Sequence, residues 1–219
     1  MNRRTFLATS GLATAVGFAG CLGSDDGVNL ASLETVYEWY ENDEARFIDT
    51  RGQRQYDADH IEGAVLSTAP NGVANDPTNE WDHDTKIVAY CDCPHTLAVQ
   101  RGENLIDDGF TDINALDDGY PAWVDAGYPI EENAAANVAT YDVRGMSDPS
   151  HAGEYVWVSD LEAEQHEISP VGEDGTYELT LRFADLTEDS LLTVDAPDYT
   201  GEATLSQLTS DVVTEANLQ

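Results

Sequence analysis

Two cysteines lie in a short loop between a strand-like and a helix-like segment, and one of them is placed to act as a nucleophile. The apolar residues 87–90 predict a buried strand that ends at Cys91. A helix is predicted over residues 97–109, and Gly109 is a suitable residue to end it. Free backbone N–H groups and the positive end of the helix dipole favour an anion in such a loop. A thiolate is such an anion, so this position can lower the pKa of Cys91 without a nearby lysine.

The second cysteine of the loop has several possible roles. Cys93 lies two residues after Cys91, and His95 lies two residues further on. These three side chains could bind zinc or copper, with His60 or His83 as a fourth ligand. Cys93 could instead resolve an oxidised or persulfidated Cys91 by forming a disulfide. It could also be an ordinary loop residue. We assign no resident metal and no cofactor to the site.

The segments around this loop follow an α/β pattern. Ser32 is a suitable N-cap for a helix whose apolar residues recur at helical spacing. A short helix begins at Pro121, and strand-like segments occupy residues 47–48, 64–66, 87–90 and 113–116. The alternation of strands and helices predicts a parallel sheet with helices on both faces, in a domain spanning residues 31–133. Sites in such folds lie at the carboxyl ends of the strands, where Cys91 is expected.

Four motifs of this domain resemble those of a rhodanese domain and occur in the same order. They are Phe47-Ile48-Asp49-Thr50-Arg51 with Tyr56, His60-Ile61-Glu62-Gly63-Ala64, Ile87-Val88-Ala89-Tyr90-Cys91, and Asp117-Asp118-Gly119-Tyr120-Pro121-Ala122-Trp123 with Gly127-Tyr128-Pro129. The resemblance implies a rhodanese-like α/β fold and a six-residue active-site loop, here Cys91, Asp92, Cys93, Pro94, His95 and Thr96. It also implies a persulfide intermediate on Cys91. The implied activity is that of a sulfurtransferase, which moves sulfane sulfur from a donor to a thiol or cyanide acceptor.

Three residues outside the loop are expected to support it. Asp49 and Arg51 are predicted to brace the neighbouring loop as a charge-assisted pair, although Asp49 could equally cap a turn. We expect His60 to fix a loop rather than to transfer a proton. Many family members carry an arginine where this chain has Thr96, and this loop adds the negative charge of Asp92. A persulfide is therefore a more suitable sulfur donor than dianionic thiosulfate.

Residues 138–219 follow a linker of small residues and have a different pattern. Apolar and polar residues alternate from Tyr177 to Phe183, and Asp174-Gly175 is a hairpin-turn signal. Six strand candidates predict a small β-sandwich without helices: residues 138–143, 155–158, 167–171, 177–183, 191–194 and 203–208. The segment shows no nucleophile or metal cluster, so we expect it to be an accessory domain that is dispensable for chemistry. His151 and His166 are expected at its surface.

The first 21 residues have the features of a twin-arginine export signal. Arg3 and Arg4 precede a short apolar stretch, and Phe18-Ala19-Gly20-Cys21 resembles a lipobox. This predicts a mature protein that begins at Cys21 and is held by lipid on the outer face of the cell membrane. Residues 22–30 would form a flexible tether. The alternative is a cleaved signal without lipid.

The charge balance excludes one class of function and leaves two open. The chain has 43 acidic and 9 basic side chains and a net charge of −34, so we expect no nucleic-acid partner. Its apolar runs are too regular for a disordered chain, and the composition suits a folded protein adapted to high salt. One open function is an exported sulfurtransferase, with a small-molecule or protein sulfur donor and a thiol acceptor as partners. The other is a non-catalytic rhodanese-fold module that binds a partner, or a metal at Cys91, Cys93 and His95.

Overall fold

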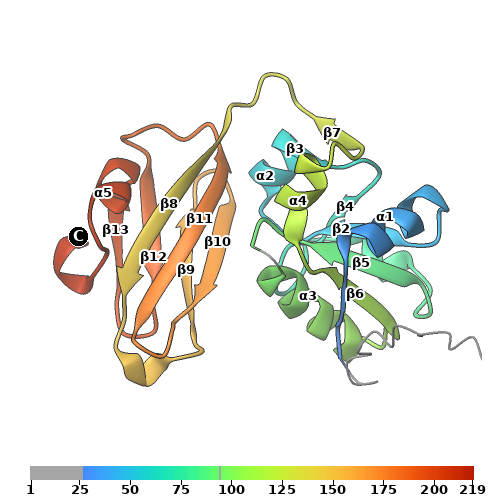
Figure 1. Cartoon of the computed structure of the whole chain (residues 1–219), viewed down its shortest axis with the longest axis horizontal. Coiled ribbons are helices and arrows are strands. Elements are labelled where there is room, and N and C mark those ends of the chain that lie inside the picture. The colour runs from blue at the N-terminus through green and yellow to red at the C-terminus, as the bar shows by residue number, and fades with distance from the viewer. Residues whose placement is uncertain (1–26, 94) are drawn as a thin grey trace, which may run out of the picture.

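The computed structural model describes residues 27–93 and 95–219, which form two regions built on separate sheets (Figure 1). The twin-arginine signal and the lipidated cysteine predicted at Cys21 lie outside the described residues, as does Pro94 of the predicted active-site loop. Within the described ranges, no helix is long and apolar enough to cross a membrane.

The first region contains the predicted parallel sheet, which has five strands in the order β1-β6-β5-β2-β4. The strands are β1 (Asn29–Ala31), β6 (Asp112–Leu116), β5 (Lys86–Tyr90), β2 (Arg46–Asp49) and β4 (Val65–Leu66), and each pairs with its neighbours in parallel. Assigning the whole of residues 22–30 to a flexible tether was wrong, because residues 29 and 30 belong to β1. This strand satisfies backbone groups of β6 that would otherwise form an open sheet edge.

Helices cover both faces of this sheet, as the sequence predicts. The side chains of β5 alternate between the two faces. On one side, Ile87 and Ala89 pack with α3 (Thr96–Asp107). On the other side, Val88 and Tyr90 pack with α1 (Leu33–Glu41) and α4 (Gly119–Asp125). The hydroxyl of Ser32 caps α1 by accepting a hydrogen bond from the N–H of Thr35. Gly109 follows α3 at a φ of +103°, where glycine is favoured.

Short elements complete the first region and lead to the second. A 3₁₀ turn, η1 (Pro77–Glu80), lies in the loop before β5. Helix α2 (Gln53–Ala58) follows β2 and packs against strands of the second region. Strand β3 (Asp59–Ile61) pairs antiparallel with β7 (Ile130–Glu132), which precedes the crossing into the second region (Figure 1).

The second region consists of antiparallel sheets around one hydrophobic core. Strand β8 (Val138–Met146) pairs with β11 (Thr176–Ala184). A four-stranded sheet has the order β10-β9-β12-β13, with β9 (Tyr155–Asp160), β10 (Gln165–Pro170), β12 (Leu191–Asp195) and β13 (Thr200–Thr204). The 3₁₀ turn η2 (Pro149–His151) lies between β8 and β9, and the 3₁₀ turn η3 (Glu215–Asn217) comes after β13. We refer to residues 138–219 as the C-terminal β region.

Two sequence expectations for the C-terminal β region are wrong. The strand expected over residues 203–208 ends at Thr204, and helix α5 (Leu205–Ser210) follows. Thr204 and Gln207 form a capping box that starts this helix. His166 is not a surface residue, since it is mostly buried where β10 meets the first region.

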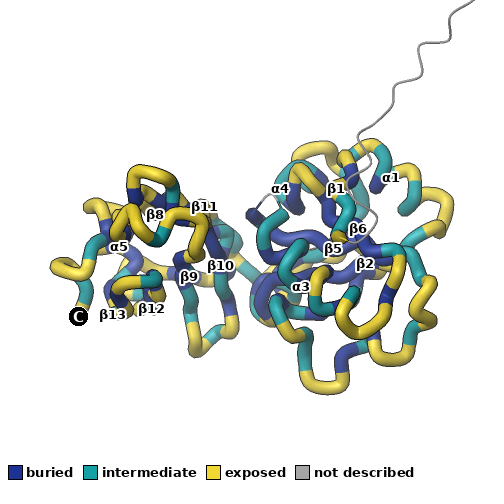
Figure 2. Tube along the Cα trace, turned by 90° about the horizontal axis from the view of Figure 1, so that it is seen from below, coloured by how far each residue is buried: buried dark blue, intermediate teal, exposed yellow. Residues whose placement is uncertain are grey.

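Strand β10 is buried on both of its faces, unlike a strand that has one face in solvent. Glu167, Ile168 and Ser169 are consecutive and all buried (Figure 2). Ile168 packs in the same hydrophobic cluster as Cys91 and Leu97 of the first region. The C-terminal β region therefore covers the carboxyl end of β5, where the predicted nucleophile lies.

Candidate active site at the junction of the two regions

Cys91 follows the last residue of β5 and is completely buried. Its thiol donates a hydrogen bond to the backbone carbonyl of Cys93, at an Sγ–O distance of 2.8 Å. Its own carbonyl accepts from the backbone N–H of Tyr120 at 2.8 Å, which ties the loop to the start of α4. The sequence placed this cysteine at the carboxyl end of a parallel strand, and the structure has it there.

The N-terminus of α3 faces the second cysteine. The backbone N–H of Leu97 lies 3.4 Å from the Sγ of Cys93 and donates to it. Burial, and next the neighbouring Cys91, raise the pKa of the Cys93 thiol well above its ordinary value, although the Leu97 N–H opposes this shift. Cys93 is therefore held as a thiol next to Cys91, with both cysteines in the reduced form.

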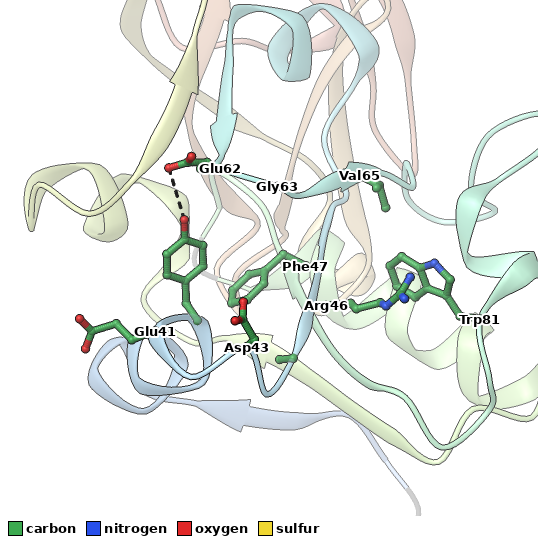
Figure 3. Close-up of a pocket in the computed structure, with 10 residues that line it drawn as sticks. Glu41, Asp43, Arg46, Phe47, Glu62, Gly63, Val65 and Trp81 are labelled. Atoms are coloured by element: carbon green, nitrogen blue, oxygen red, sulfur yellow. Dashed lines mark hydrogen bonds between the residues drawn. The ribbon is translucent and has the colours of Figure 1, made fainter.

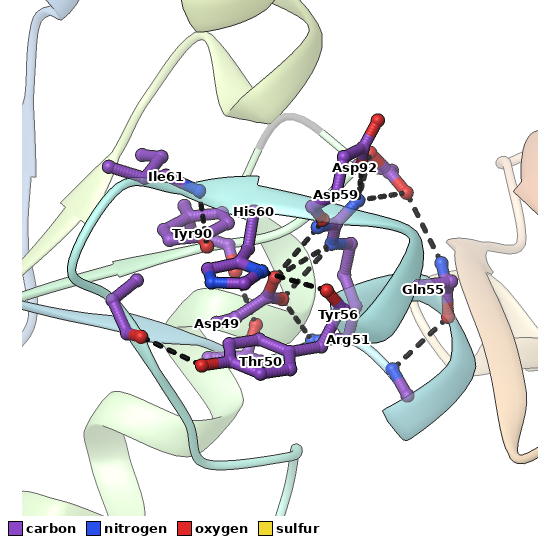
Figure 4. A network of polar contacts seen from close by, with 12 residues as sticks. Asp49, Thr50, Arg51, Gln55, Tyr56, Asp59, His60, Ile61, Tyr90 and Asp92 are labelled. Atoms are coloured by element: carbon purple, nitrogen blue, oxygen red, sulfur yellow. Dashed lines mark hydrogen bonds and ion pairs between the residues drawn. The ribbon is translucent and has the colours of Figure 1, made fainter. Parts of the chain in front are cut away.

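Arg51 organises the polar groups around the loop (Figure 4). Its side chain is fully buried and pairs with Asp49, with the shortest N–O distance at 2.7 Å. Another nitrogen, Nη1, lies 3.2 Å from both carboxylate oxygens of Asp92, and Nη2 donates to the Asp59 carbonyl at 2.6 Å. Burial lowers the pKa of the guanidinium, but Asp49 and Asp92 outweigh it and raise the pKa well above its usual value. The expected Asp49–Arg51 pair is present and extends to the loop itself.

Asp92 is the charged residue next to the nucleophile, and its carboxylate is almost completely buried. Burial raises its pKa, and the charges of Arg51 and Arg182 only partly offset this. Gln55 of α2 also donates to it at 3.2 Å. The loop therefore carries no cation of its own, but two arginines from outside the loop approach Asp92.

Arg182 is a site residue that the sequence did not reveal, and it comes from β11 of the C-terminal β region. Its guanidinium makes a bidentate ion pair with Asp59, with N–O distances of 2.9 and 2.5 Å. One of these two nitrogens, Nη1, also lies 3.8 Å from a carboxylate oxygen of Asp92. Burial raises the pKa of Asp59, but the hydrogen bond from Arg182 and the charge of Arg51 lower it overall. One feature of the sequence could have indicated Arg182. The chain has only 9 basic side chains, so each arginine is a candidate partner for a buried carboxylate.

Glu167 of β10 is the second site residue that the sequence did not reveal. Its side chain is fully buried, and Oε1 accepts from the backbone N–H of Ile168 at 3.0 Å. Its other oxygen, Oε2, has no hydrogen-bond partner among residues 27–93 and 95–219. Burial, and then the neighbouring Cys93 and Asp92, raise the pKa of Glu167 well above its ordinary range. Nothing in the strand pattern around it marked this glutamate as a residue facing the cysteine loop.

The other predicted site residues hold the surroundings of the loop. His60 stacks on Tyr56 and its Nδ1 lies 2.8 Å from the Tyr56 carbonyl oxygen, so it fixes the turn between α2 and β3. Thr96 is the first residue of α3. His95 precedes it, with Nδ1 3.0 Å from a carboxylate oxygen of Asp117.

The alternative of a metal site at Cys91, Cys93 and His95 has no matching cluster of ligands in the described part of the chain. No group of three His, Cys, Asp or Glu side chains there is arranged to hold a metal ion. His83 packs against Phe110 with the two rings tilted, and the imidazole of His60 stacks on Tyr56. The third residue of the Cys-x-Cys-x-His spacing, His95, is paired with Asp117.

A cavity of about 570 Å³ lies away from these residues, at the start of β2 (Figure 3). Arg46 stacks over Trp81 in its wall, and Tyr40 donates to Glu62 at 3.5 Å. Because this is the opposite end of β2 from Asp49, the cavity is not part of the site around Cys91.

Comparisons with known proteins agree with the region that the sequence motifs marked. Residues 32–126 match the family described as the rhodanese-like domain. The HTH-type transcriptional regulator Rv0324 of Mycobacterium tuberculosis is 32% identical over 121 residues, which are 55% of this chain and 51% of the regulator. This chain thus spans about half the length of that curated relative.

Two solved structures are also similar to part of the chain. The rhodanese-like domain of the Alr3790 protein from Anabaena sp. has a TM-score of 0.43 and 21% identity, over 48% of this chain and 79% of that one. The thiosulfate sulfurtransferase of Pseudomonas aeruginosa has a TM-score of 0.41 and 22% identity, over 48% of this chain and 20% of that enzyme.

Proposed function

Because residues 32–126 form a rhodanese-like domain, we propose that the protein is a sulfurtransferase that carries sulfane sulfur as a persulfide on Cys91. The observation that carries this proposal is the position of Cys91 at the carboxyl end of β5, directly before the loop that leads into α3. Parallel α/β folds place their sites at this edge of the sheet. A cysteine there has the sulfur nucleophile that the transfer needs.

The reaction proceeds in two balanced halves. The Cys91 thiolate attacks the outer sulfur of a donor persulfide, R–S–SH, and a new S–S bond forms while the donor's S–S bond breaks. The thiolate R–S⁻ leaves and takes up a proton. In the second half, an acceptor thiolate attacks the outer sulfur of Cys91–S–SH, forms a new persulfide and regenerates the Cys91 thiolate. No net oxidant or reductant is consumed.

The charges around the loop favour a persulfide over thiosulfate as the donor. Asp49, Asp59 and Asp92 face two cations, Arg51 and Arg182, so the network has one more carboxylate than cation. Both arginines already pair with these carboxylates. A dianion would therefore meet repulsion that is weakly screened in a buried site.

The mass of the protein tests the proposal. After incubation with an organic persulfide and removal of excess donor, the wild-type protein should gain the mass of one sulfur atom, and a thiol should remove it. Cys91→Ser should gain nothing, because its hydroxyl cannot replace the thiolate in this attack. Cys93→Ser is the matched control and should still accept sulfur. An equal gain in Cys91→Ser and wild type would sink the assignment.

A second function has one observation in its favour. Cys91 is completely buried beneath the C-terminal β region, which suits a rhodanese-fold module that binds a partner without turnover. Multiple turnovers of sulfur from persulfide to an acceptor thiol would exclude this alternative, whereas a protein that never acquires sulfur would favour it.

We also propose that the protein is exported by the twin-arginine route and held at the outer face of the cell membrane by lipid on Cys21. The support is the sequence Arg3-Arg4, the apolar stretch after it and the small residues before Cys21. In membrane fractionation, the wild-type protein should sediment with membranes and Cys21→Ala should not be anchored. A Cys21→Ala protein that stays fully membrane-bound would contradict the lipid anchor.

A further inference from the structure

A cavity of about 270 Å³ lies at the junction of the two regions, beside the active-site loop. Asp92 of the loop forms part of its wall, so the cavity reaches the residue that follows Cys91. Helix α4 contributes Pro121, Val124 and Asp125, and β11 contributes Arg182. Neither region forms this cavity alone.

The size and apolar wall of the cavity suit a small organic molecule. Its volume is near the lower end of ligand pockets in proteins. Pro121 and Val124 offer apolar contact for a short carbon chain, and Thr140 and Thr180 line the opposite side, which the C-terminal β region provides. A macromolecular segment would need a longer groove.

The charges in and behind the wall favour a cationic group on the occupant. Arg182 is the wall's one cation among the lining residues, and Asp59 holds its guanidinium with two hydrogen bonds. Behind it, Asp49 offsets the charge of Arg51. Asp125 remains as an exposed carboxylate without an ion pair among the described residues. Even with Asp92 protonated, carboxylates outnumber cations by one.

We propose that this cavity binds the organic part of a small thiol or persulfide that carries an ammonium group. This inference rests on the proposed sulfur transfer at Cys91 and names the substrate class for it. The ammonium lies against Asp125, the methylene groups lie on Val124 and Pro121, and the sulfur end points toward the loop at Asp92. A carboxylate on the same chain would face Asp92 and Asp125 and bind less well.

A charge series of donors tests the proposal. The persulfides of cysteamine, 2-mercaptoethanol and mercaptoacetate are close in size and carry an ammonium, a hydroxyl and a carboxylate. At low salt, KM for sulfur loading of Cys91 should be lowest for cysteamine persulfide and highest for mercaptoacetate persulfide. The expected difference is about three- to fivefold per step, as for an exposed or half-exposed ion pair.

Two variants and one control locate the effect. Asp125→Asn should raise KM for cysteamine persulfide about three- to fivefold and leave the hydroxyl donor unchanged. Thr180→Trp should fill the cavity and raise KM for all three donors. Asp84→Asn removes an exposed carboxylate at the other end of β5 and should change none of these values. Equal KM values for the three donors in the wild-type protein would overturn the proposal, as would a preference that survives Asp125→Asn.

A binding measurement separates this proposal from the one on sulfur transfer. In Cys91→Ser protein, which cannot react, 2-(methylthio)ethylamine is an inert probe of the cavity. Its titration, followed by calorimetry or NMR, should saturate and weaken about three- to fivefold in the added Asp125→Asn variant. Absence of saturable binding would overturn the cavity assignment whether or not Cys91 accepts sulfur. Saturable binding without sulfur loading in wild type would leave the cavity standing and remove the proposed chemistry.

Discussion

The rhodanese-like domain and the C-terminal β region both place charged side chains near Cys91, but the elements that supply these side chains differ. Asp49, Arg51 and Asp92 come from strand ends that the parallel sheet brings together. Arg182 and Glu167 come from two different sheets of the C-terminal β region, β11-β8 and β10-β9-β12-β13. Both residues lie more than 70 positions after Cys91 in the sequence.

This difference shows that a region without a nucleophile can still shape a site. Ile168 belongs to the same hydrophobic cluster as Cys91, and Arg182 pairs with Asp59. The backbone N–H of His166 donates to the side chain of Gln55 at 3.1 Å. These contacts join the two regions at the predicted active site. The expectation that residues 138–219 are dispensable for chemistry therefore needs a direct test, because their removal would uncover buried polar groups.

The largest effect is expected for the charge network within the rhodanese-like domain. Arg51→Ala leaves Asp49 and Asp92 buried without their main cation, so the free energy of unfolding should fall by about 3–5 kcal/mol. Urea unfolding followed by circular dichroism measures this loss. Arg144→Ala is the control, because its ion pair with Glu178 is largely exposed and its loss should not be measurable. Equal stability of Arg51→Ala and wild type would show that the network is not structural.

A smaller effect is expected for the charge that the C-terminal β region contributes. Arg182→Ala removes two hydrogen bonds to Asp59 and should lower the free energy of unfolding by about 2–3 kcal/mol. It should also loosen the junction, so that the two regions unfold at more distinct temperatures in calorimetry. Adding Asp59→Asn to Arg182→Ala should cost less than the sum of the single losses. Additive losses would mean that the two side chains are not coupled.

The smallest effect concerns pH and the buried glutamate. The folded protein raises the pKa of Glu167 above its unfolded value, so folding favours the protonated acid. The contribution of that acid to stability is complete below the unfolded pKa and is lost as pH rises through the folded pKa. The side chain of the Glu167→Gln variant is neutral at every pH. Between about pH 5 and pH 9, its free energy of unfolding should therefore fall by about 1–2 kcal/mol less than that of the wild-type protein. Thermal unfolding of both proteins at both pH values measures this difference.

The control for this pH effect is Glu178→Gln, which changes an exposed glutamate of the same region. Its stability should follow the wild-type pH profile. If Glu167→Gln also follows that profile, the carboxyl of Glu167 does not titrate in a buried environment, and the close contact of β10 with the loop is weaker than the structure indicates.

The sequence alone was sufficient for the main helices and strands of the rhodanese-like domain and for the position of Cys91, but it missed β1, α2, β3 and β7. Helical spacing after Ser32 predicted α1, and the apolar run before Cys91 predicted β5. These features are local, because a side-chain period and a capping residue act within a few positions of the chain. Asp49 and Arg51, which were expected to pair from the family motif, lie two positions apart, so their pair is also a local feature.

Only the tertiary structure decided what surrounds Cys91. The alternation in β11 assigned Arg182 to the face away from the core of the C-terminal β region, but it could not say that another domain covers this face. Glu167 has no local signal for its burial. His95 stands two residues from Cys93, yet it turns to Asp117. Such contacts join residues far apart in sequence and depend on how two separately folded cores meet, so no sequence period encodes them.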